Sequence, residues 1–383
     1  MSYEDKRDDL LNKYPAISDL AAKAKSRMPN VSWAYLETGT GEEHQLRRNI
    51  EAFKDITLTP RFCKGQLSPK IKTTFCGQTY NAPFGIAPVG LTGLMWPQAE
   101  LLLAKTAQRY NIPVTLSTVA TETPETVGPI AKDLGWFQLY TPREPELCKT
   151  IMDRAWQSGY KTLVITVDIP APSRRERSKR AGLTMPPKIT PNMIWQGITH
   201  PTWTLNTLRR GLPSLRTVSS YAQFRSMMSV GAFVEGQMGG NLSWDYCKRI
   251  RDEWKGDVFV KGILHPLDAQ ECINLGADGI VVSNHGGRQF DGSASAIELL
   301  PSIVTEVQGK CPIIFDSGIR TGLDVLKAIH LGADFVLLGR AFIYGVAALG
   351  TYGADHVCEI IAGDLKNNMT QLGISSLEEI RSL

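Results

Sequence analysis

The stretch SNHGGRQFDG at residues 283–292 places a histidine and an arginine directly after the apolar run GIVV. A strand that only has to turn would end in Gly, Asn or Asp, so His285 and Arg288 need another reason. Histidine titrates near neutral pH and can take a proton from a hydroxyl group, whereas arginine can bind a carboxylate through two parallel hydrogen bonds. The two residues together therefore suit a 2-hydroxy acid, with its hydroxyl deprotonated and its carboxylate held.

Asp168 follows another apolar run, at 162–167, and could orient the imidazole of His285 and stabilise its cation. Each of these residues also has a plainer interpretation: a hydrogen-bonded core histidine, a solvated arginine, or an aspartate that caps a helix. Their shared position at strand ends favours the catalytic interpretation.

Two loops combine glycine with arginine, namely DSGIRTG at 316–322 and the pair Gly339-Arg340. Glycine lets the backbone approach a ligand closely, helix N-termini supply free N–H groups, and arginine binds an anion bidentately. The loops therefore predict a phosphate site, and tight turns with solvated arginines are the alternative.

Lys261 ends the apolar run VFVKGI at 258–263, so we expect its ammonium group inside the protein. A buried lysine is unfavourable unless it meets an anion or changes its charge. Three partners remain open on this ground alone: a ring that becomes negative on reduction, a carbonyl that forms a Schiff base, or a structural carboxylate.

These residues need elements that bring them to one place. Short apolar runs separated by helical patterns such as 97–110 and 322–332 occur eight times, at 84–88, 114–118, 136–140, 162–167, 258–263, 279–284, 313–318 and 335–340. Continuously apolar strands indicate a sheet covered on both faces. Eight of them predict an α/β fold, a (β/α)8 TIM barrel whose active site lies at the C-terminal strand ends. A doubly wound open sheet is the alternative, although no GxGxxG motif follows the first strand.

The chain is expected to form a single domain, 1–383. Roughly 90 residues separate Asp168 from Val258, far more than a normal crossover needs, so we expect an insert after the fourth strand. The expected parts are an N-terminal helical cap (1–80, with a helix at 46–53), the barrel (81–355), the insert (183–225) and C-terminal helices (356–383).

Composition narrows the class of protein. Apolar residues make up 43% and charged residues 21% of the chain, as in a soluble globular protein, and the net charge of +4 gives no argument for nucleic acid. Seven scattered cysteines without CxxC spacing indicate reduced thiols in a reducing compartment. The charged N-terminal stretch has no apolar core, and no run is long enough to span a bilayer, so we expect a cytoplasmic protein.

SNHGGRQFDG, together with FDSGIRTGLDVLKAIHLGA at 315–333 and LLGRA at 337–341, resembles the FMN-dependent α-hydroxy-acid dehydrogenase and oxidase family. The resemblance runs from about Trp33 to the C-terminus, apart from parts of the insert. It implies FMN as the cofactor and oxidation of an (S)-2-hydroxy acid, such as lactate or mandelate, to the 2-keto acid. It does not decide whether hydride transfer or carbanion formation comes first, since both use the same base.

The resemblance also implies roles for single residues. His285 is implied to be the catalytic base, Asp168 its partner, and Tyr140 a neighbour of the substrate hydroxyl. Contacts to the substrate carboxylate are implied for Tyr35, Arg175 and Arg288. Contacts to FMN are implied for Pro88, Val89 and Gly90 near N5, for Ser117, Gln138 and Thr166 at the ring, for Lys261 at N1 and O2, for Ser283 at the ribityl region, and for Asp316, Gly318, Arg320, Gly339 and Arg340 at the ribityl chain and phosphate.

The electron acceptor is a separate question. Gly90 stands where oxygen-using members of the family commonly have alanine, which favours a dehydrogenase over an oxidase that produces hydrogen peroxide. Residues 174–216 contain nine Lys and Arg against Glu176 alone, a net charge of +8. Among their large apolar residues are Met193, Ile194, Trp195, Ile198, Trp203, Leu205 and Leu208. This composition predicts peripheral binding to the inner leaflet of the membrane and a quinone acceptor, with an arginine-rich active-site lid as the alternative.

The substrate is less well defined. Val119 stands where some family members have a bulky tryptophan, which indicates room for lactate, mandelate or a longer 2-hydroxy acid. Met193, Met227 and Met228 could reshape the pocket further. The resemblance suggests a homotetramer. A barrel that has lost catalysis and serves as a phosphate-ligand sensor is the rival from another class, which the complete set of active-site residues disfavours.

Overall fold

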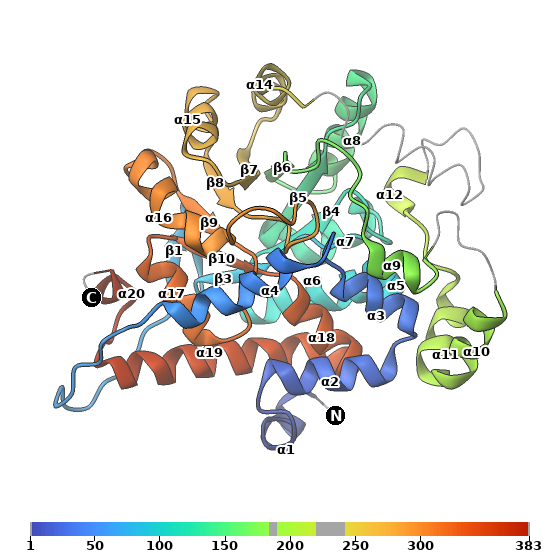
Figure 1. The fold of residues 1–383 in the computed structure, drawn as a ribbon, viewed down its shortest axis with the longest axis horizontal. Coiled ribbons are helices and arrows are strands. Elements are labelled where there is room, and N and C mark those ends of the chain that lie inside the picture. The colour runs from blue at the N-terminus through green and yellow to red at the C-terminus, as the bar shows by residue number, and fades with distance from the viewer. Residues whose placement is uncertain (1, 184–189, 220–241, 382–383) are drawn as a thin grey trace.

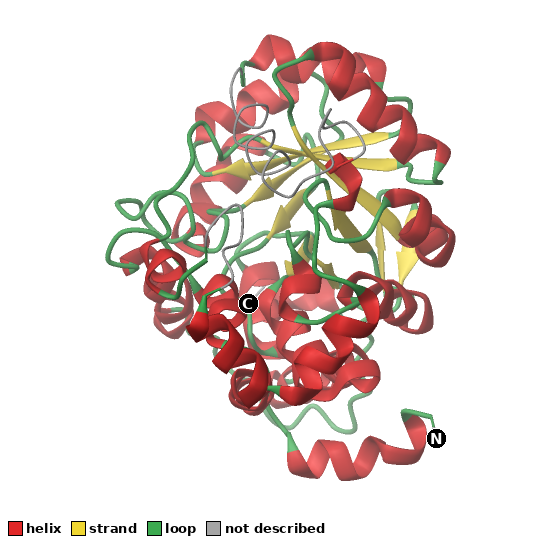
Figure 2. Cartoon of the chain, turned by 90° about the vertical axis from the view of Figure 1, so that its right-hand side faces the viewer, coloured by secondary structure: helices red, strands yellow, loops and turns green. Residues whose placement is uncertain are grey.

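The computed structural model describes residues 2–183, 190–219 and 242–381. Eight parallel strands close into a barrel in the order β10-β3-β4-β5-β6-β7-β8-β9. Figure 2 shows the strands in yellow with helices around them. They are β3 (Phe84–Ile86), β4 (Val114–Ser117), β5 (Gly135–Tyr140), β6 (Thr162–Thr166), β7 (Asp257–Ile263), β8 (Gly279–Val282), β9 (Ile313–Phe315) and β10 (Phe335–Leu338). Each strand coincides with one of the eight apolar runs, so the predicted TIM barrel is confirmed and the open sheet is excluded.

Alternation along the strands decides what faces the inside of the barrel. Trp136 and Phe259 belong to a buried cluster inside it, whereas their neighbours Phe137 and Val258 belong to the larger core shared with the surrounding helices. Because side chains alternate with a period of two, Gln138 and Lys261 follow on the inner side one step nearer the C-terminal end. The interior is therefore apolar at one end and polar at the other.

Helices cover the outside of the barrel (Figure 1). They are α6 (Ala99–Tyr110), α7 (Pro124–Ala131), α8 (Pro145–Gln157), α14 (Trp244–Glu253), α15 (Pro266–Asn274), α16 (Ala296–Val307), α17 (Gly322–His330) and α18 (Arg340–Leu349), followed by α19 (Gly353–Leu372) and α20 (Leu377–Ile380). The helical pattern at 322–332 is confirmed: α17 ends at His330, and Gly332, two residues later, takes a φ of +104°.

The first eighty residues are helical only in part. Their helices are α1 (Arg7–Lys13), α2 (Ile17–Arg27), α3 (Asn30–Glu37) and α4 (His44–Glu51), the last of which covers most of the predicted 46–53. Residues 73–80 instead form an antiparallel hairpin of β1 (Thr73–Phe75) and β2 (Gln78–Tyr80). Phe75 places its ring 5.0 Å from that of Phe335 and 5.8 Å from that of Phe259, so the hairpin closes the apolar end of the barrel.

The long connection between β6 and β7 leaves the barrel before α14 returns to it. It contains α9 (Glu176–Arg180), α10 (Pro191–Thr199), α11 (Pro201–Arg210) and α12 (Arg216–Ser219). Figure 1 shows α10 and α11 projecting from the body beside α3 and α5 (Thr92–Met95). Met227 and Met228 lie outside the described residues.

The seven cysteines are free thiols, five of them buried, and Cys63 and Cys76 are exposed. This agrees with the expected reduced, mostly core thiols. Within the described parts of the chain, no helix is both long and apolar enough to cross a bilayer.

Candidate active site

A cavity of about 540 Å³ opens at the C-terminal ends of the strands. It brings together most of the residues that the sequence singled out: Tyr35, Pro88, Val89, Gly90, Gln138, Tyr140, Thr166, Arg175, Lys261, His285, Arg288, Asp316, Gly318, Arg320, Gly339 and Arg340. Three expected residues do not line it but stand behind it. Ser117 bonds Gln138, Asp168 bonds His285, and Ser283 bonds Lys261.

The imidazole of His285 is held between two groups. Its Nδ1 lies 2.9 Å from Oδ1 of Asp168 and its Nε2 lies 3.3 Å from the Tyr140 hydroxyl. Since the carboxylate can only accept, Nδ1 carries the proton, and Nε2 is left with its lone pair. The basic nitrogen of this histidine is therefore Nε2, which accepts a hydrogen bond from the Tyr140 hydroxyl.

Burial sets the charges of this pair. It lowers the pKa of His285 below its usual value, and the neighbouring carboxylate only partly offsets the effect. Burial also acts to raise the pKa of Asp168, but the attraction of His285 and Lys261 outweighs it and leaves that pKa below its usual value. At neutral pH the imidazole is therefore neutral and the carboxylate ionised.

Two guanidinium groups reach the same cavity from different loops. Arg288 stacks 4.8 Å over the ring of Tyr35, and Arg175 donates to Ser173 Oγ at 2.9 Å. Burial and repulsion from Arg175 lower the pKa of Arg288 to about 9. An anion placed between them would relieve both effects, which suits a carboxylate ligand.

Lys261 is buried at the cavity wall beside anionic and polar partners. Its Nζ donates to Ser283 Oγ at 2.7 Å and lies 3.1 Å from Asp316 Oδ2. Burial acts to lower its pKa, but Asp316 and Asp168 outweigh this and raise it, so the ammonium keeps its charge. Of the three partners left open, the structural carboxylate is present, and the charged amine argues against a Schiff base.

A chain of hydrogen bonds runs along the wall next to Lys261. Ser117 donates to Gln138 Oε1 at 2.8 Å, and Gln138 Nε2 donates to Thr166 Oγ1 at 2.9 Å. These contacts fix the amide orientation of Gln138 in the cavity. A polar wall of this kind matches the edge of a heteroaromatic ring.

The two loops predicted for phosphate differ in what their arginines already bind. Arg340 donates to the carbonyl oxygens of Leu36, Gly286 and Thr38 at 2.9, 3.0 and 3.1 Å, which leaves two of its five N–H donors. Arg320 makes one such bond, from Nη1 to Ile319 O at 2.8 Å. Arg320 is therefore the freer of the two for an anion.

These features fit FMN. A buried cation suits a ring that gains negative charge, the Ser117–Gln138–Thr166 chain suits the polar ring edge, and the amide end of α18 with Arg320 suits a phosphate. At Gly318, an added Cβ would lie 2.0 Å from Asn49 O, so only glycine permits this close approach of two backbones.

Sequence reasoning missed several residues of the cavity. Leu183 and Leu215 come from the long connection and supply apolar lining. Gln289 also lines it, and its Nε2 is buried without a partner among the described residues. Gln289 directly follows HGGR, so its position beside this motif could have identified it as a cavity residue. The sequence contains no comparable signal for Leu183 and Leu215.

Fold and site together define a TIM-barrel oxidoreductase that holds a phosphate-bearing cofactor at the C-terminal strand ends. Residues 24–383 match the family model described as FMN-dependent dehydrogenase. The chain belongs to this family, and FMN is its cofactor.

Individual relatives agree. The chain is 39% identical over 368 residues to an L-lactate dehydrogenase of Allorhizobium ampelinum, covering 95% of this chain and 96% of the relative. It is 40% identical over 370 residues to an L-lactate dehydrogenase of Stenotrophomonas maltophilia, with 95% and 97% covered. Among solved structures, the monotopic membrane protein (S)-mandelate dehydrogenase superposes with a TM-score of 0.90 at 33% identity, covering 95% of this chain and 97% of that one. Mandelate oxidase with (S)-4-hydroxymandelic acid gives a TM-score of 0.82 at 30% identity, with 96% and 98% covered.

Proposed function

We propose that this protein oxidises an (S)-2-hydroxy acid to the 2-keto acid and passes the electrons to a membrane quinone. The observation that carries the proposal is the neutral imidazole of His285, which bonds Asp168 through Nδ1 at 2.9 Å and faces a cavity that also holds Arg175 and Arg288. The proposed base and the two arginines proposed to hold the carboxylate thus line one cavity. The names of the relatives support the substrate class.

In this proposal, Nε2 of His285 takes the proton from the substrate hydroxyl. Asp168 stabilises the imidazolium that forms, and Tyr140 orients the hydroxyl. Arg175, Arg288 and Tyr35 hold the carboxylate, so that one enantiomer presents its α-hydrogen to the cofactor. When bound, FMN supplies the two-electron acceptor for the α-hydrogen and its bonding electrons.

The cofactor contacts are likewise proposed residue by residue. Lys261 would stabilise negative charge on the reduced ring, while Pro88, Val89 and Gly90 would lie against its face. Ser117, Gln138 and Thr166 would serve its polar edge, and Ser283, Asp316, Gly318, Arg320, Gly339 and Arg340 would hold the ribityl chain and phosphate.

Lactate and mandelate both remain candidate substrates. The relatives by sequence are L-lactate dehydrogenases, and those by structure act on mandelate. Gly90 has no side chain and Val119 is small, so the cavity leaves room for a side chain larger than methyl. Leu183 and Leu215 would provide apolar contacts for an aryl group.

The proposed acceptor rests on α10 and α11. Six large apolar side chains stand more than half exposed on this pair and just after it: Ile194, Trp195, Ile198, Leu205, Leu208 and Leu212. The pair is anchored from its other side, because Gln196 accepts from Val31 N at 3.1 Å and Trp203 donates to Leu94 O at 3.1 Å. An apolar surface flanked by Arg209 and Arg210 suits an anionic bilayer interface better than a lid, which would turn its apolar side inward.

The substrate proposal is tested by anaerobic bleaching of the flavin with the two enantiomers of lactate and of mandelate. The wild-type protein should bleach with the S form, and His285→Gln should stay yellow and bleach about 100- to 10,000-fold more slowly. Full-rate bleaching of the variant would contradict the assignment of His285 as the base. If no 2-hydroxy acid bleached the wild-type flavin, the result would favour the rival hypothesis of a non-catalytic ligand sensor. Under air, a stoichiometric yield of hydrogen peroxide would identify an oxidase instead of a dehydrogenase.

The membrane proposal is tested by flotation with vesicles that contain anionic lipid. Trp195→Glu with Leu208→Glu should move the protein out of the vesicle fraction. Leu267→Glu is the matched control, because Leu267 is 67% exposed on α15, which lies apart from α10 and α11 (Figure 1). If the double variant floated with the vesicles as well as the control variant does, membrane binding through α10 and α11 would be contradicted.

A further inference from the structure

The loop that carries His285 has an unusual backbone. Residues 285, 286 and 287 all take positive φ values, of 57°, 66° and 75°. Only glycine adopts this region readily, and consecutive left-handed residues are rare even then. The conformation of His285 is therefore held by specific side-chain contacts rather than by local backbone preference.

Each backbone N–H from Asn284 to Gly287 is bonded to a side chain. His285 N donates to Ser283 Oγ at 3.1 Å, and Gly287 N donates to Asn284 Oδ1 at 3.1 Å. The remaining two, Asn284 N and Gly286 N, both donate to Ser317 Oγ, at 3.3 and 3.1 Å. One hydroxyl oxygen from another loop thus binds both neighbours of His285.

Ser317 is itself in a constrained position. It takes a φ of 87°, where a residue with a side chain is strained, and it precedes Gly318. Its hydroxyl donates to Asp316 Oδ1 at 2.9 Å, and the other oxygen of Asp316 pairs with Lys261. Lys261 in turn donates to Ser283, which completes a closed ring of contacts around the backbone of His285.

We propose that Ser317 is a positioning residue for His285, whose hydroxyl holds the two amides that flank the base and links them through Asp316 to Lys261. The proposal rests on His285 being the base, as proposed above. Because Ser317 bonds residues 284 and 286 rather than Arg288, it should affect proton transfer more than carboxylate binding.

Two substitutions separate the hydroxyl from the backbone strain. Ser317→Ala removes the hydroxyl and keeps a side chain at positive φ, whereas Ser317→Gly removes the hydroxyl and relieves the strain. If Ser317→Ala fails to fold, Ser317→Gly still tests the hydroxyl. Gln308→Gly is the control for glycine at a left-handed position, because Gln308 has a φ of 51° at the end of α16 and does not line the cavity.

We expect both Ser317 variants to bind FMN with an unchanged visible spectrum. Their anaerobic flavin reduction by the best 2-hydroxy acid should slow about tenfold or more, since small misplacements of a catalytic group have effects of this size. The substrate concentration for half-maximal reduction should change little, and Gln308→Gly should behave as wild type. Wild-type reduction rates in Ser317→Gly would overturn the proposal.

A double-variant cycle identifies the route of the effect. In a His285→Gln background, Ser317→Gly should cause no further slowing, because the group that it positions is gone. A full additional tenfold loss would show that Ser317 acts elsewhere and would overturn the proposal while leaving the base in place. A wild-type rate in His285→Gln alone would instead overturn the base, so the two failures are distinguishable.

Discussion

The two ends of the barrel use the same strands for different purposes. At the N-terminal end, Phe75 of the hairpin packs its ring against those of Phe335, Phe259 and Trp136, with ring centroids 5.0 to 6.3 Å apart. Two residues further along one of these strands, Lys261 stands on the same inner side and pairs with Asp316. The closed apolar end supplies packing energy, and that packing allows the other end to hold buried charges around a cavity.

The largest expected effect is a loss of stability from a substitution at the apolar end of the barrel, without a loss of activity. Phe75→Ala should lower the free energy of unfolding by about 3–5 kcal/mol, because a buried aromatic ring is lost and the barrel cannot collapse to fill its place. Flavin reduction measured well below the melting temperature should stay near the wild-type rate. Thermal and denaturant unfolding check the first part and anaerobic bleaching the second; a large loss of rate in a folded protein would mean that the two ends are coupled.

The next effect is confined to the polar end. Asp168→Asn should slow flavin reduction by about 100-fold or more, because the imidazolium formed on proton transfer loses its partner. In the wild type, kcat/KM should fall as the pH drops through the lowered pKa of His285, below the usual value for histidine. Asp168 raises that pKa, so the acid limb of the variant should move to lower pH; a limb that stays in place would contradict the pairing.

The smallest effect tests the cavity wall at Gly90, where the flavin ring is proposed to lie. A Cβ on Gly90 would lie 2.7 Å from Val119 Cγ2 and 3.5 Å from the Tyr35 hydroxyl. Gly90→Ala should therefore slow flavin reduction by about tenfold, since either the backbone at residue 90 or the side chain of Val119 must shift. Adding Val119→Ala should restore most of the rate, and peroxide yield should be measured alongside. A Gly90→Ala protein with full activity would show that Val119 and Tyr35 can move to accommodate the added methyl group without loss of function.

Sequence reasoning reached the barrel through its apolar runs, and it reached most of the cavity residues through the resemblance of motifs such as SNHGGRQFDG to a known family. Short apolar runs marked the strands, and the lysine inside the run VFVKGI marked Lys261 as a buried cation. It missed the hairpin at 73–80, because each strand has only three residues and leaves no readable alternation. The part played by Ser317 depends on contacts between loops about 30 residues apart, which local patterns do not encode.

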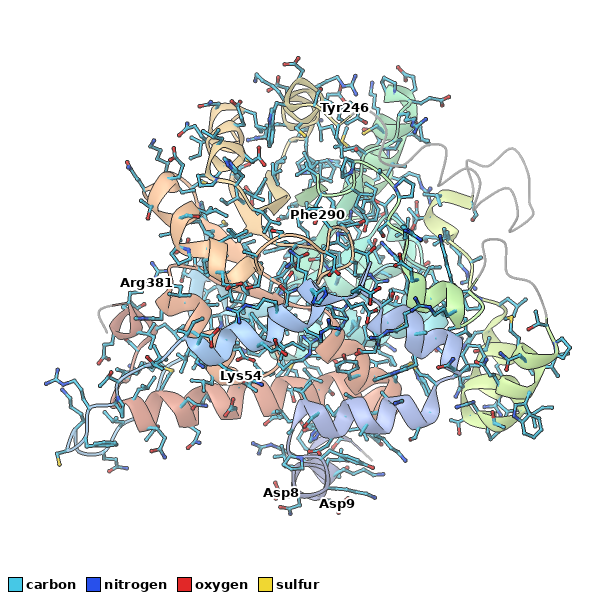
Figure 3. All side chains as sticks on the ribbon, viewed as in Figure 1. Asp8, Asp9, Lys54, Tyr246, Phe290 and Arg381 are labelled. Carbon is cyan, nitrogen blue, oxygen red and sulfur yellow. The ribbon has the colours of Figure 1, made fainter. Side chains whose placement is uncertain are left out.

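The arginines show the same limit. Arg320 and Arg340 look equivalent in sequence, because each lies within two residues of a glycine shortly after a strand. Only the structure distinguishes them, because Arg340 binds three backbone carbonyls and Arg320 one. The loop beyond His285 carries the exposed Phe290 (Figure 3), to which the sequence motifs assigned no role.

The hydrogen bonds of Arg340 also limit how far the chain can be truncated from its N-terminus. Two of its three carbonyl partners, Leu36 and Thr38, belong to the end of α3 and the residue after it, and the third is Gly286. One guanidinium thus fastens the N-terminal segment to the histidine loop. A truncated form that starts beyond Thr38 would lack Tyr35 and Leu36, which line the cavity, and two of the three carbonyl oxygens that Arg340 binds, so such a form should lose both cavity lining and the support of Arg340.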